Sequence, residues 1–121
     1  WIQLGHIYFD TGQPNEAIQA YEKALAIAPK NANVLTDLGV MYRRSKRPKK
    51  AVENFDKAIQ VDSGHEIARF NKGNVLLHDL DDTEGALEAW RERVAINPAA
   101  QAPNGQTVKA LIQRFSEKAN N

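Results

Sequence analysis

The fold is decided by residues 1–31, WIQLGHIYFDTGQPNEAIQAYEKALAIAPKN, because their pattern returns in residues 32–65, ANVLTDLGVMYRRSKRPKKAVENFDKAIQVDSGH. Every recurring position lies 34 residues further on, as from Gly5 to Gly39. The recurring residues are Leu4, Gly5, Tyr8, Ala17, Ile18, Tyr21, Ala24 and Leu25, followed by Leu38, Gly39, Tyr42, Ala51, Val52, Phe55, Ala58 and Ile59. After one inserted residue near Asp81 and Asp82, residues 66–100 repeat the pattern less completely. A fixed period of this length indicates stacked repeat units.

Each unit is predicted to contain two helices joined by a short polar turn. Ala17, Tyr21 and Ala24 stand at i, i+4 and i+7, which places them on one helix face. Pro14 and Pro48 suit the first turn of a helix. A backbone N–H at this position would have no hydrogen-bond acceptor within the helix, so proline, which lacks the N–H, breaks no hydrogen bond there. The predicted helices are residues 1–11, 14–28, 32–45, 48–62, 66–79, 83–97 and 106–118. No strand pattern of comparable strength appears.

Small residues recur at two positions of each unit. Gly5, Gly39 and Gly73 are expected where the first helix crosses its partner, and Ala17, Ala51 and Ala86 at the facing point of the second helix, because larger side chains would hold the axes apart. The bulky residues four positions later are then expected to fill the space between one unit and the next. They are Tyr21, Phe55 and Trp90.

These positions make the chain resemble the tetratricopeptide repeat family. The first unit carries the family's residues at Trp1, Leu4, Gly5, Tyr8, Ala17, Tyr21, Ala24 and Pro29. The second keeps Gly39, Tyr42, Ala51, Phe55 and Ala58, with Leu35 for the tryptophan and Ser63 for the proline. The third keeps Gly73, Ala86, Trp90 and Pro98 but has Arg69, Lys72 and Arg93 where the family places packing residues. The resemblance implies an all-α fold, a right-handed α-solenoid of three antiparallel helix pairs.

In the family's register the three units are residues 1–31, 32–65 and 66–100. The first unit then lacks its first three positions, so we expect the chain to be a piece of a longer protein. Residues 101–121 are predicted to be a linker and a capping helix, because one face is apolar and the opposite face is polar. The apolar face consists of Val108, Leu111, Ile112 and Phe115. The alternative is a helix offered to a partner.

Composition excludes several classes of protein. Sixteen Lys and Arg residues against fifteen Asp and Glu give a net charge of +1, so there is no global field to gather nucleic acid or an anionic membrane. The absence of cysteine removes disulfides and thiolate chemistry. No apolar run approaches the roughly 20 residues that span a bilayer. We expect a soluble fragment, with cytoplasmic and periplasmic locations both open.

Catalytic and metal chemistry are not predicted. The segment from His65 to Arg69 begins like a zinc-protease motif, but Arg69 stands where the second histidine is needed. His6 and His78 have no carboxylate partner nearby in the sequence. No glycine-rich phosphate loop or nucleophile motif is present. We therefore predict a protein that is not an enzyme and has no cofactor or metal.

The run Arg43-Arg44-Ser45-Lys46-Arg47-Pro48-Lys49-Lys50 holds six cations in eight residues. One interpretation is a site for phosphate, nucleic acid or an acidic peptide. The favoured interpretation is structural: the run closes a helix and is expected to face the acidic residues of the next unit's turn, Asp79, Asp81, Asp82 and Glu84. No aromatic residues interleave with the run for base stacking, which argues against nucleic acid as a partner.

In an array of helix pairs the first helices line the concave wall, where a partner is expected to bind. The family's inward positions, carried over one by one, are Ile2, Gln3, His6, Phe9, Asp10, Thr36, Asp37, Val40, Arg43, Arg44, Phe70, Asn71, Asn74, Leu77 and His78. Apolar anchors among amides suit a peptide or helix of a partner protein. For Phe9 and Leu77 the alternative is packing against the neighbouring first helix.

The resemblance also allows a test for one subclass. Chaperone-binding members clamp a partner's carboxylates with lysine, asparagine and arginine, whereas the matching positions here are Ile2, His6, Asp37, Ile67 and Asn71. The clamp is missing, so a different peptide is expected. A second hypothesis is self-assembly, with the incomplete first unit stacking head to tail in a larger complex. A third, an assembly factor in a secretory or cytochrome-maturation complex, rests on analogy with bacterial members of the family.

Overall fold

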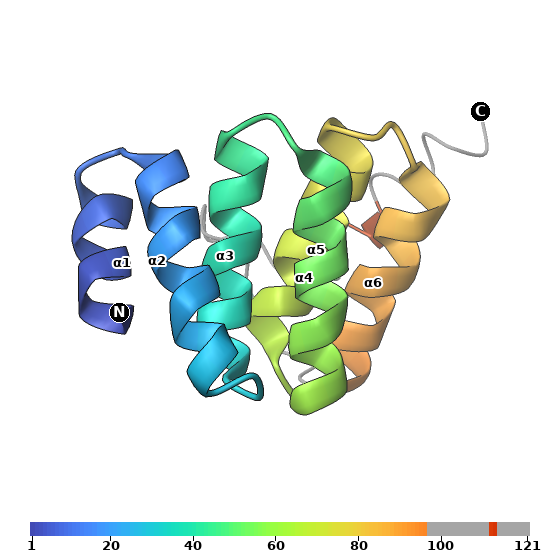
Figure 1. Ribbon diagram of the computed structural model, residues 1–121. Coiled ribbons are helices and arrows are strands. Elements are labelled where there is room, and N and C mark those ends of the chain that lie inside the picture. The colour runs from blue at the N-terminus through green and yellow to red at the C-terminus, as the bar shows by residue number, and fades with distance from the viewer. Residues whose placement is uncertain (97–111, 114–121) are drawn as a thin grey trace.

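The computed structural model describes residues 1–96 and 112–113, and residues 1–96 form three helical hairpins laid side by side (Figure 1). The helices are α1 (Ile2–Asp10), α2 (Pro14–Ile27), α3 (Ala32–Arg44), α4 (Pro48–Val61), α5 (Glu66–His78) and α6 (Thr83–Ile96). The sequence prediction of these six helices is confirmed to within two residues at each end. Among the described residues none is in a strand. None of the described helices is long and apolar enough to cross a membrane.

Two predictions fall beyond these residues. The proline signature position Pro98 and the linker and capping helix of 101–121 lie outside the described residues, apart from Ile112 and Gln113.

Local sequence explains where the helices begin. Pro14 and Pro48 occupy the first turn of α2 and α4. The side chain of Asn31 caps α3 by accepting a hydrogen bond from the Val34 N–H at 3.1 Å. His65 caps α5 in the same way, because its Nδ1 accepts from the Ala68 N–H at 3.2 Å.

The turn inside each hairpin uses the same backbone conformation. Gly12, Lys46 and Asp81 occupy equivalent positions and have φ values of 70°, 65° and 58°. Glycine adopts this left-handed conformation freely, whereas in lysine and aspartate the Cβ atom comes too close to the backbone and makes the conformation less favourable. The turn therefore needs the conformation in all three units, although only the first unit supplies the residue that suits it best.

The glycines of the first helices lie where that helix meets its partner, as the sequence predicted. A Cβ atom at Gly39 would lie 2.5 Å from Cε1 of Phe55, and the corresponding distances are 2.4 Å from Gly5 to Tyr21 and 2.2 Å from Gly73 to Trp90. The ring at each crossing therefore comes from the same hairpin as the glycine. Tyr21 and Phe55 also belong to a cluster that continues into the neighbouring units. The alanines at the facing positions, Ala17, Ala51 and Ala86, are fully buried.

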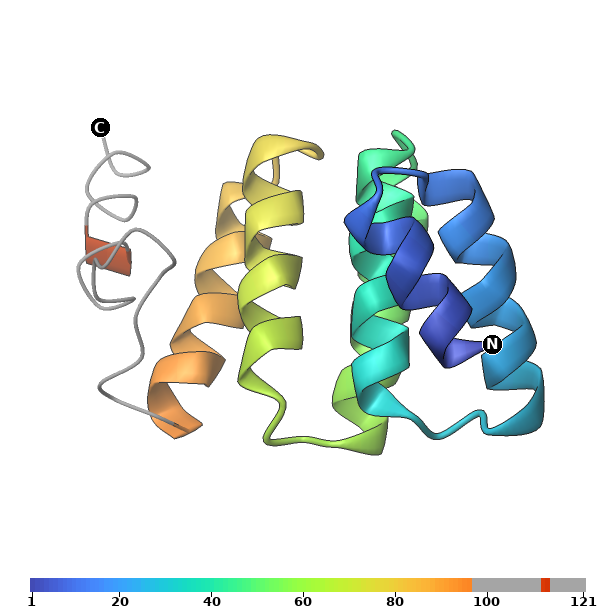
Figure 2. The same cartoon turned by 90° about the vertical axis from the view of Figure 1, so that its left-hand side faces the viewer.

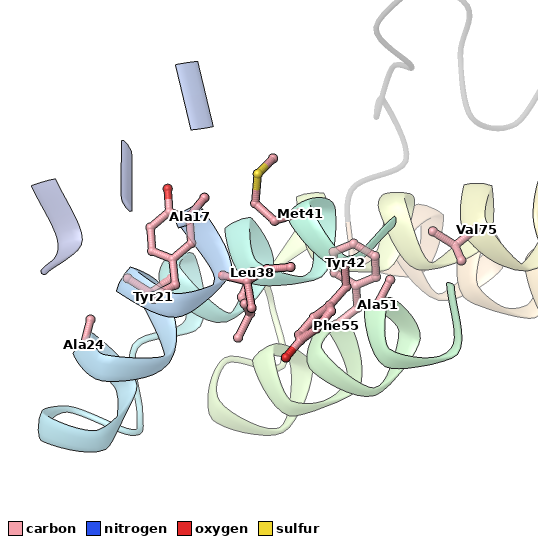
Figure 3. Close-up of a cluster of buried hydrophobic side chains, with 11 residues drawn as sticks. Ala17, Tyr21, Ala24, Leu38, Met41, Tyr42, Ala51, Phe55 and Val75 are labelled. Atoms are coloured by element: carbon pink, nitrogen blue, oxygen red, sulfur yellow. The ribbon is translucent and has the colours of Figure 1, made fainter. Parts of the chain in front are cut away.

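A cluster of buried hydrophobic side chains runs from the first hairpin into the third (Figure 3). The second unit contributes Leu38, Met41 and Phe55, and they pack with Tyr21 of the first unit and Val75 of the third. Because each unit shares its core with its neighbours, no unit buries its apolar face alone.

Polar contacts complete the junction between the second and third units. Lys72 stands where the family has a packing residue, and its Nζ lies 2.7 Å from Oδ1 of Asp56 on α4. Arg69, at another such position, donates a hydrogen bond to the backbone carbonyl of Ser63. The cations in the third unit thus have partners in the second unit or in the loop that precedes α5. The side chain of Arg93 lies outside the described residues.

We predict that Gly39→Ala lowers the free energy of unfolding by about 1–3 kcal/mol, because the new methyl group would overlap the buried Phe55 ring. This loss should exceed the gain in helix propensity. The matched control is Gly64→Ala, since the nearest atom to its Cβ would be Asp62 Oδ1 at 3.6 Å. Urea unfolding followed by circular dichroism measures both. Equal stability of the two variants would contradict the close-packing role of Gly39.

Candidate functional site

The exposed surfaces of α1, α3 and α5 form one wall of the stack, which we call the inner wall. α3 and α5 contact each other directly. α1 is tied to α3 by two side-chain contacts: His6 with Asp37, and Phe9 with Arg44. Figure 2 shows the molecule from the side on which α1 lies, with α1 in front. The first helices of the three units therefore lie side by side, as the sequence predicted.

The predicted site residues differ in how accessible they are. Exposed residues of the inner wall are Gln3, His6, Asp10, Arg44 and His78. Half-buried residues are Ile2, Phe9, Asp37, Val40, Arg43, Asn71, Asn74 and Leu77. These remain candidates for contact with a partner.

Phe70 and Thr36 do not belong to the accessible surface, which corrects the prediction for both. Phe70 is 5% exposed and its ring stacks on Trp90 with centroids 6.2 Å apart. Thr36 is 4% exposed, and its hydroxyl donates to the Ala32 carbonyl at 2.8 Å. The two residues are 34 positions apart and therefore occupy the same position of the repeat. In both units the side chain at this position is buried between helices. Phe70 is therefore a core residue and offers no open anchor.

His6 has a carboxylate partner from the next unit. Its Nε2 lies 3.4 Å from Oδ2 of Asp37, and its ring meets the edge of Tyr21 at a centroid distance of 5.8 Å. Burial raises the pKa of Asp37 above its ordinary value, and His6 only partly offsets this. Burial and the nearby Asp37 and Asp10 also raise the pKa of the Tyr21 hydroxyl, which has no hydrogen-bond partner in the described part of the chain.

The basic run is partly neutralised by the neighbouring units. Arg43 donates from Nε to Oδ2 of Asp79 at 2.7 Å, so one of the four predicted acidic residues does pair with the run. Arg44 lies over the Phe9 ring at 4.7 Å from its centroid. The first of these contacts supports the structural interpretation of the run, and the second shows that Phe9 packs against the neighbouring first helix.

Aromatic rings do accompany the basic run, although none interleaves with it in the sequence. Arg47 and Lys50 lie 5.9 and 5.5 Å from the centroid of Tyr42. Tyr42 is 5% exposed, and its hydroxyl donates to Glu22. Burial and the hydrogen bond to Glu22 raise the pKa of Tyr42 to about 12. A buried ring offers no platform for a nucleic-acid base.

A pocket of about 620 Å³ opens where α3 and α5 end. Its lining combines apolar side chains with three cations and one carboxylate. The lining residues are Val40, Arg43, Arg44, Lys46, Pro48, Phe55, Asn71 and Asp79. Four of them were predicted for the inner wall. The sequence did not assign the other four lining residues to the site, because the turn after α3, α4 and the end of α5 come together only in the folded stack. These residues are Lys46, Pro48, Phe55 and Asp79.

Within residues 1–96 and 112–113, no group of three or more His, Cys, Asp or Glu side chains is arranged to hold a metal ion. The His65 ring caps α5 and its Nε2 lies 2.9 Å from Oδ1 of Asn33. Both nitrogens of His65 are thus engaged in holding the loop between α4 and α5 beside the start of α3.

Comparison with known proteins identifies the family. The family model of the tetratricopeptide repeat matches residues 1–63, about half of the chain, and the chain belongs to this family. Tetratricopeptide repeats form all-α solenoids that act as protein-interaction scaffolds.

Two curated relatives are much longer than this chain. Anaphase-promoting complex subunit 3 of Schizosaccharomyces pombe is 38% identical over 117 residues, which cover 95% of this chain and 16% of the relative. The human protein O-mannosyl-transferase TMTC3 is 30% identical over 122 residues, covering 99% of this chain and 13% of the relative. The chain thus spans about a sixth of the length of these relatives or less.

Solved structures show the same fold. The first tetratricopeptide domain of Spaghetti (RPAP3), bound to the HSP90 peptide SRMEEVD, has a TM-score of 0.85 at 21% identity, covering 99% of this chain and 90% of that one. The Sgt2 domain of Aspergillus fumigatus has a TM-score of 0.84 at 24% identity, covering 98% and 76%.

We predict a pH-dependent effect of Asp37→Asn. Because the pKa of Asp37 is raised in the folded state, the folded protein binds more protons than the unfolded chain just above the ordinary value of 3.8. The contribution of Asp37 to the free energy of unfolding therefore falls as pH rises from 3.8 through the raised pKa of the folded state. Asparagine removes this loss, so the variant should gain stability relative to the parent chain as pH rises from about 4 to 6.

Urea unfolding across this pH range measures the difference. Glu88→Gln, which removes an exposed carboxylate from α6, controls for the loss of one charge. A difference between Asp37→Asn and the parent that shrinks as pH rises would contradict the assignment.

Proposed function

We propose that this chain is a non-catalytic scaffold that holds a peptide or helix of a partner protein against the inner wall. The main support for this proposal is the 620 Å³ pocket. It lies on the wall formed by the first helices and combines apolar side chains with hydrogen-bonding groups. Binding sites of this size usually mix apolar lining with a few polar groups. The first helices of the array supply that mixture here.

Two amides support an extended ligand. Asn71 and Asn74 stand at i and i+3 on α5, which places them on the same face. Both are half-buried, and within the described residues neither side chain makes a hydrogen bond to the protein. Each amide can donate to and accept from a peptide backbone. The RPAP3 domain, which shares the fold, is described with a bound peptide, and this adds support for the same use of the wall.

The proposal assigns binding, and not catalysis, to this chain. Some relatives, such as TMTC3, are named as enzymes, but this chain matches only 13% of that protein. A repeat array within an enzyme can position a substrate or partner while another part of the chain supplies the chemistry. We therefore attribute to this chain the recognition step alone.

The test is capture of partners by immobilised variants. Asn71→Ala with Asn74→Ala should lose at least one captured protein, because two backbone contacts disappear without disturbing the fold. The control is Gln19→Ala with Gln60→Ala, which removes two exposed amides from α2 and α4. Quantitative mass spectrometry compares the captured proteins. Identical captured sets for both double variants would refute binding at the inner wall.

A second candidate function is head-to-tail stacking on α1. Trp1, Leu4 and Ile7 are 54%, 37% and 58% exposed. Their equivalents one unit later are Leu35, Leu38 and Met41, which are at most 4% exposed because the first hairpin covers them. The outer face of α1 therefore has the chemistry of a repeat junction without a covering hairpin in the described structure. A second copy of the array would supply one.

We predict that stacking, if it occurs, depends on Ile7. Ile7→Glu places a charge on the outer face of α1 and should reduce any concentration-dependent increase in sedimentation coefficient. Ile27→Glu is the control, because Ile27 is 75% exposed at the end of α2 and outside that face. Sedimentation velocity over a hundredfold range of concentration measures both. A parent chain that sediments as a monomer throughout rules out this second function.

A further inference from the structure

We propose that the pocket between α3 and α5 selects an acidic side chain of the bound segment, a carboxylate or a phosphorylated residue. This inference rests on the proposed function, because the pocket is part of the inner wall. It names a chemical class of ligand for one place on that wall. The argument depends on the charges and the apolar lining of the pocket.

The charges of the pocket favour an anion. Arg43, Arg44 and Lys46 line it together with a single carboxylate, that of Asp79. Asp79 engages Arg43 through Nε at 2.7 Å and, more weakly, through Nη2 at 3.5 Å. A guanidinium has five donors, so this pair fixes the orientation of Arg43 and leaves donors for a second acceptor. Asp79 is thus a positioning residue for the arginine.

Arg44 and Lys46 add positive charge without a carboxylate partner in the described residues. Arg44 lies over the Phe9 ring, a contact that holds the guanidinium near the wall but does not neutralise it. The pocket therefore carries a local excess of positive charge, although the whole chain has a net charge of only +1.

Lys46 is the turn residue of the second unit. The equivalent positions hold Gly12 and Asp81, with φ values of 70° and 58°, so the left-handed conformation belongs to the turn of every unit. The turn does not need a cation, since glycine forms it without strain. In the second unit this position places a lysine in the lining of the pocket.

The remaining lining suits an acidic residue on a peptide. Val40 and Pro48 supply apolar surface, which strengthens the attraction between a bound anion and the cations by excluding water, and the buried Phe55 ring forms the floor behind them. The Asn71 amide adds a hydrogen-bond donor. A volume of about 620 Å³ holds one or two side chains and not a folded element. The ligand is therefore an anion-bearing segment that continues along the inner wall.

The position differs from that of a chaperone clamp. Of the five clamp positions, only Asn71 lines this pocket, whereas Ile2, His6, Asp37 and Ile67 do not. The cations that define the pocket come from the end of α3 and from the turn that follows it.

The test uses three synthetic peptides of sequence Gly-Ser-Leu-X-Leu-Ser-Gly, with glutamate, phosphoserine or glutamine at X. Each is titrated into the ¹⁵N-labelled 121-residue chain and followed by NMR. At least one anionic peptide should shift the resonances of Lys46 and Asn71 and bind more tightly than the glutamine peptide. A preference for phosphoserine or for glutamate identifies the source of the anion.

Two charge-matched variants locate the binding. Lys46→Gln should weaken binding of the preferred anionic peptide about fivefold, the effect of a partly exposed charge pair. Lys49→Gln removes the same charge from an exposed residue of α4 that does not line the pocket, and should leave the affinity unchanged. Lys46→Gly, which installs the residue of the first unit, should lose affinity while keeping the helical circular dichroism. Equal binding of all three peptides, or equal weakening by Lys46→Gln and Lys49→Gln, overturns the proposal.

The two proposals fail in different ways. If captured proteins are lost from the Asn71→Ala, Asn74→Ala variant but no anionic peptide binds at Lys46, the scaffold function stands and the anion pocket is wrong. If the anionic peptide binds at Lys46 but no captured protein depends on Asn71 and Asn74, the pocket stands and the proposed path of a partner along these two amides is wrong.

Discussion

The structure depends on the contact between a glycine in the first helix of each unit and an aromatic ring in the second. At Gly39 the ring of Phe55 occupies the space that any Cβ atom would need. This contact lets the two helices of a hairpin approach closely and fixes how one lies across the other. Since the same pair recurs as Gly5 with Tyr21 and Gly73 with Trp90, the three hairpins share one internal geometry, and their first helices come to lie along one wall.

Both junctions between hairpins combine buried side chains with charged contacts. Between the first and second units, Leu38 and Met41 pack in the core and His6 contacts Asp37. Between the second and third, Val75 and Ala68 are buried, and the ion pairs of Lys72 with Asp56 and Arg43 with Asp79 join the helices. Ion pairs at a partly exposed junction contribute little to stability. The pair of Arg43 with Asp79 also orients the guanidinium at the pocket, whereas Lys72 and Asp56 do not line it.

The basic run illustrates how packing changes the meaning of a charge cluster. Arg47 and Lys50 lie against the buried Tyr42 ring, and Arg43 is held by Asp79. Lys46 has neither kind of contact and sits in a turn that would be less strained with glycine. Arg47 and Lys50 thus support the fold, and Arg44 and Lys46 line the pocket. Arg43 does both, because it pairs with Asp79 and also lines the pocket.

The sequence by itself determined the six helices, their turns and the order of the units, because a period of 34 residues repeats the local pattern of caps, glycines and apolar faces. It also placed most of the inner wall, including Val40, Arg43 and Asn71. Only the tertiary structure showed that Phe70 is buried against Trp90, that His6 contacts Asp37, and that the rings lie against their own unit's glycines. Helical periodicity gives the direction in which a side chain points, whereas its burial and its partners depend on neighbouring helices distant in the chain.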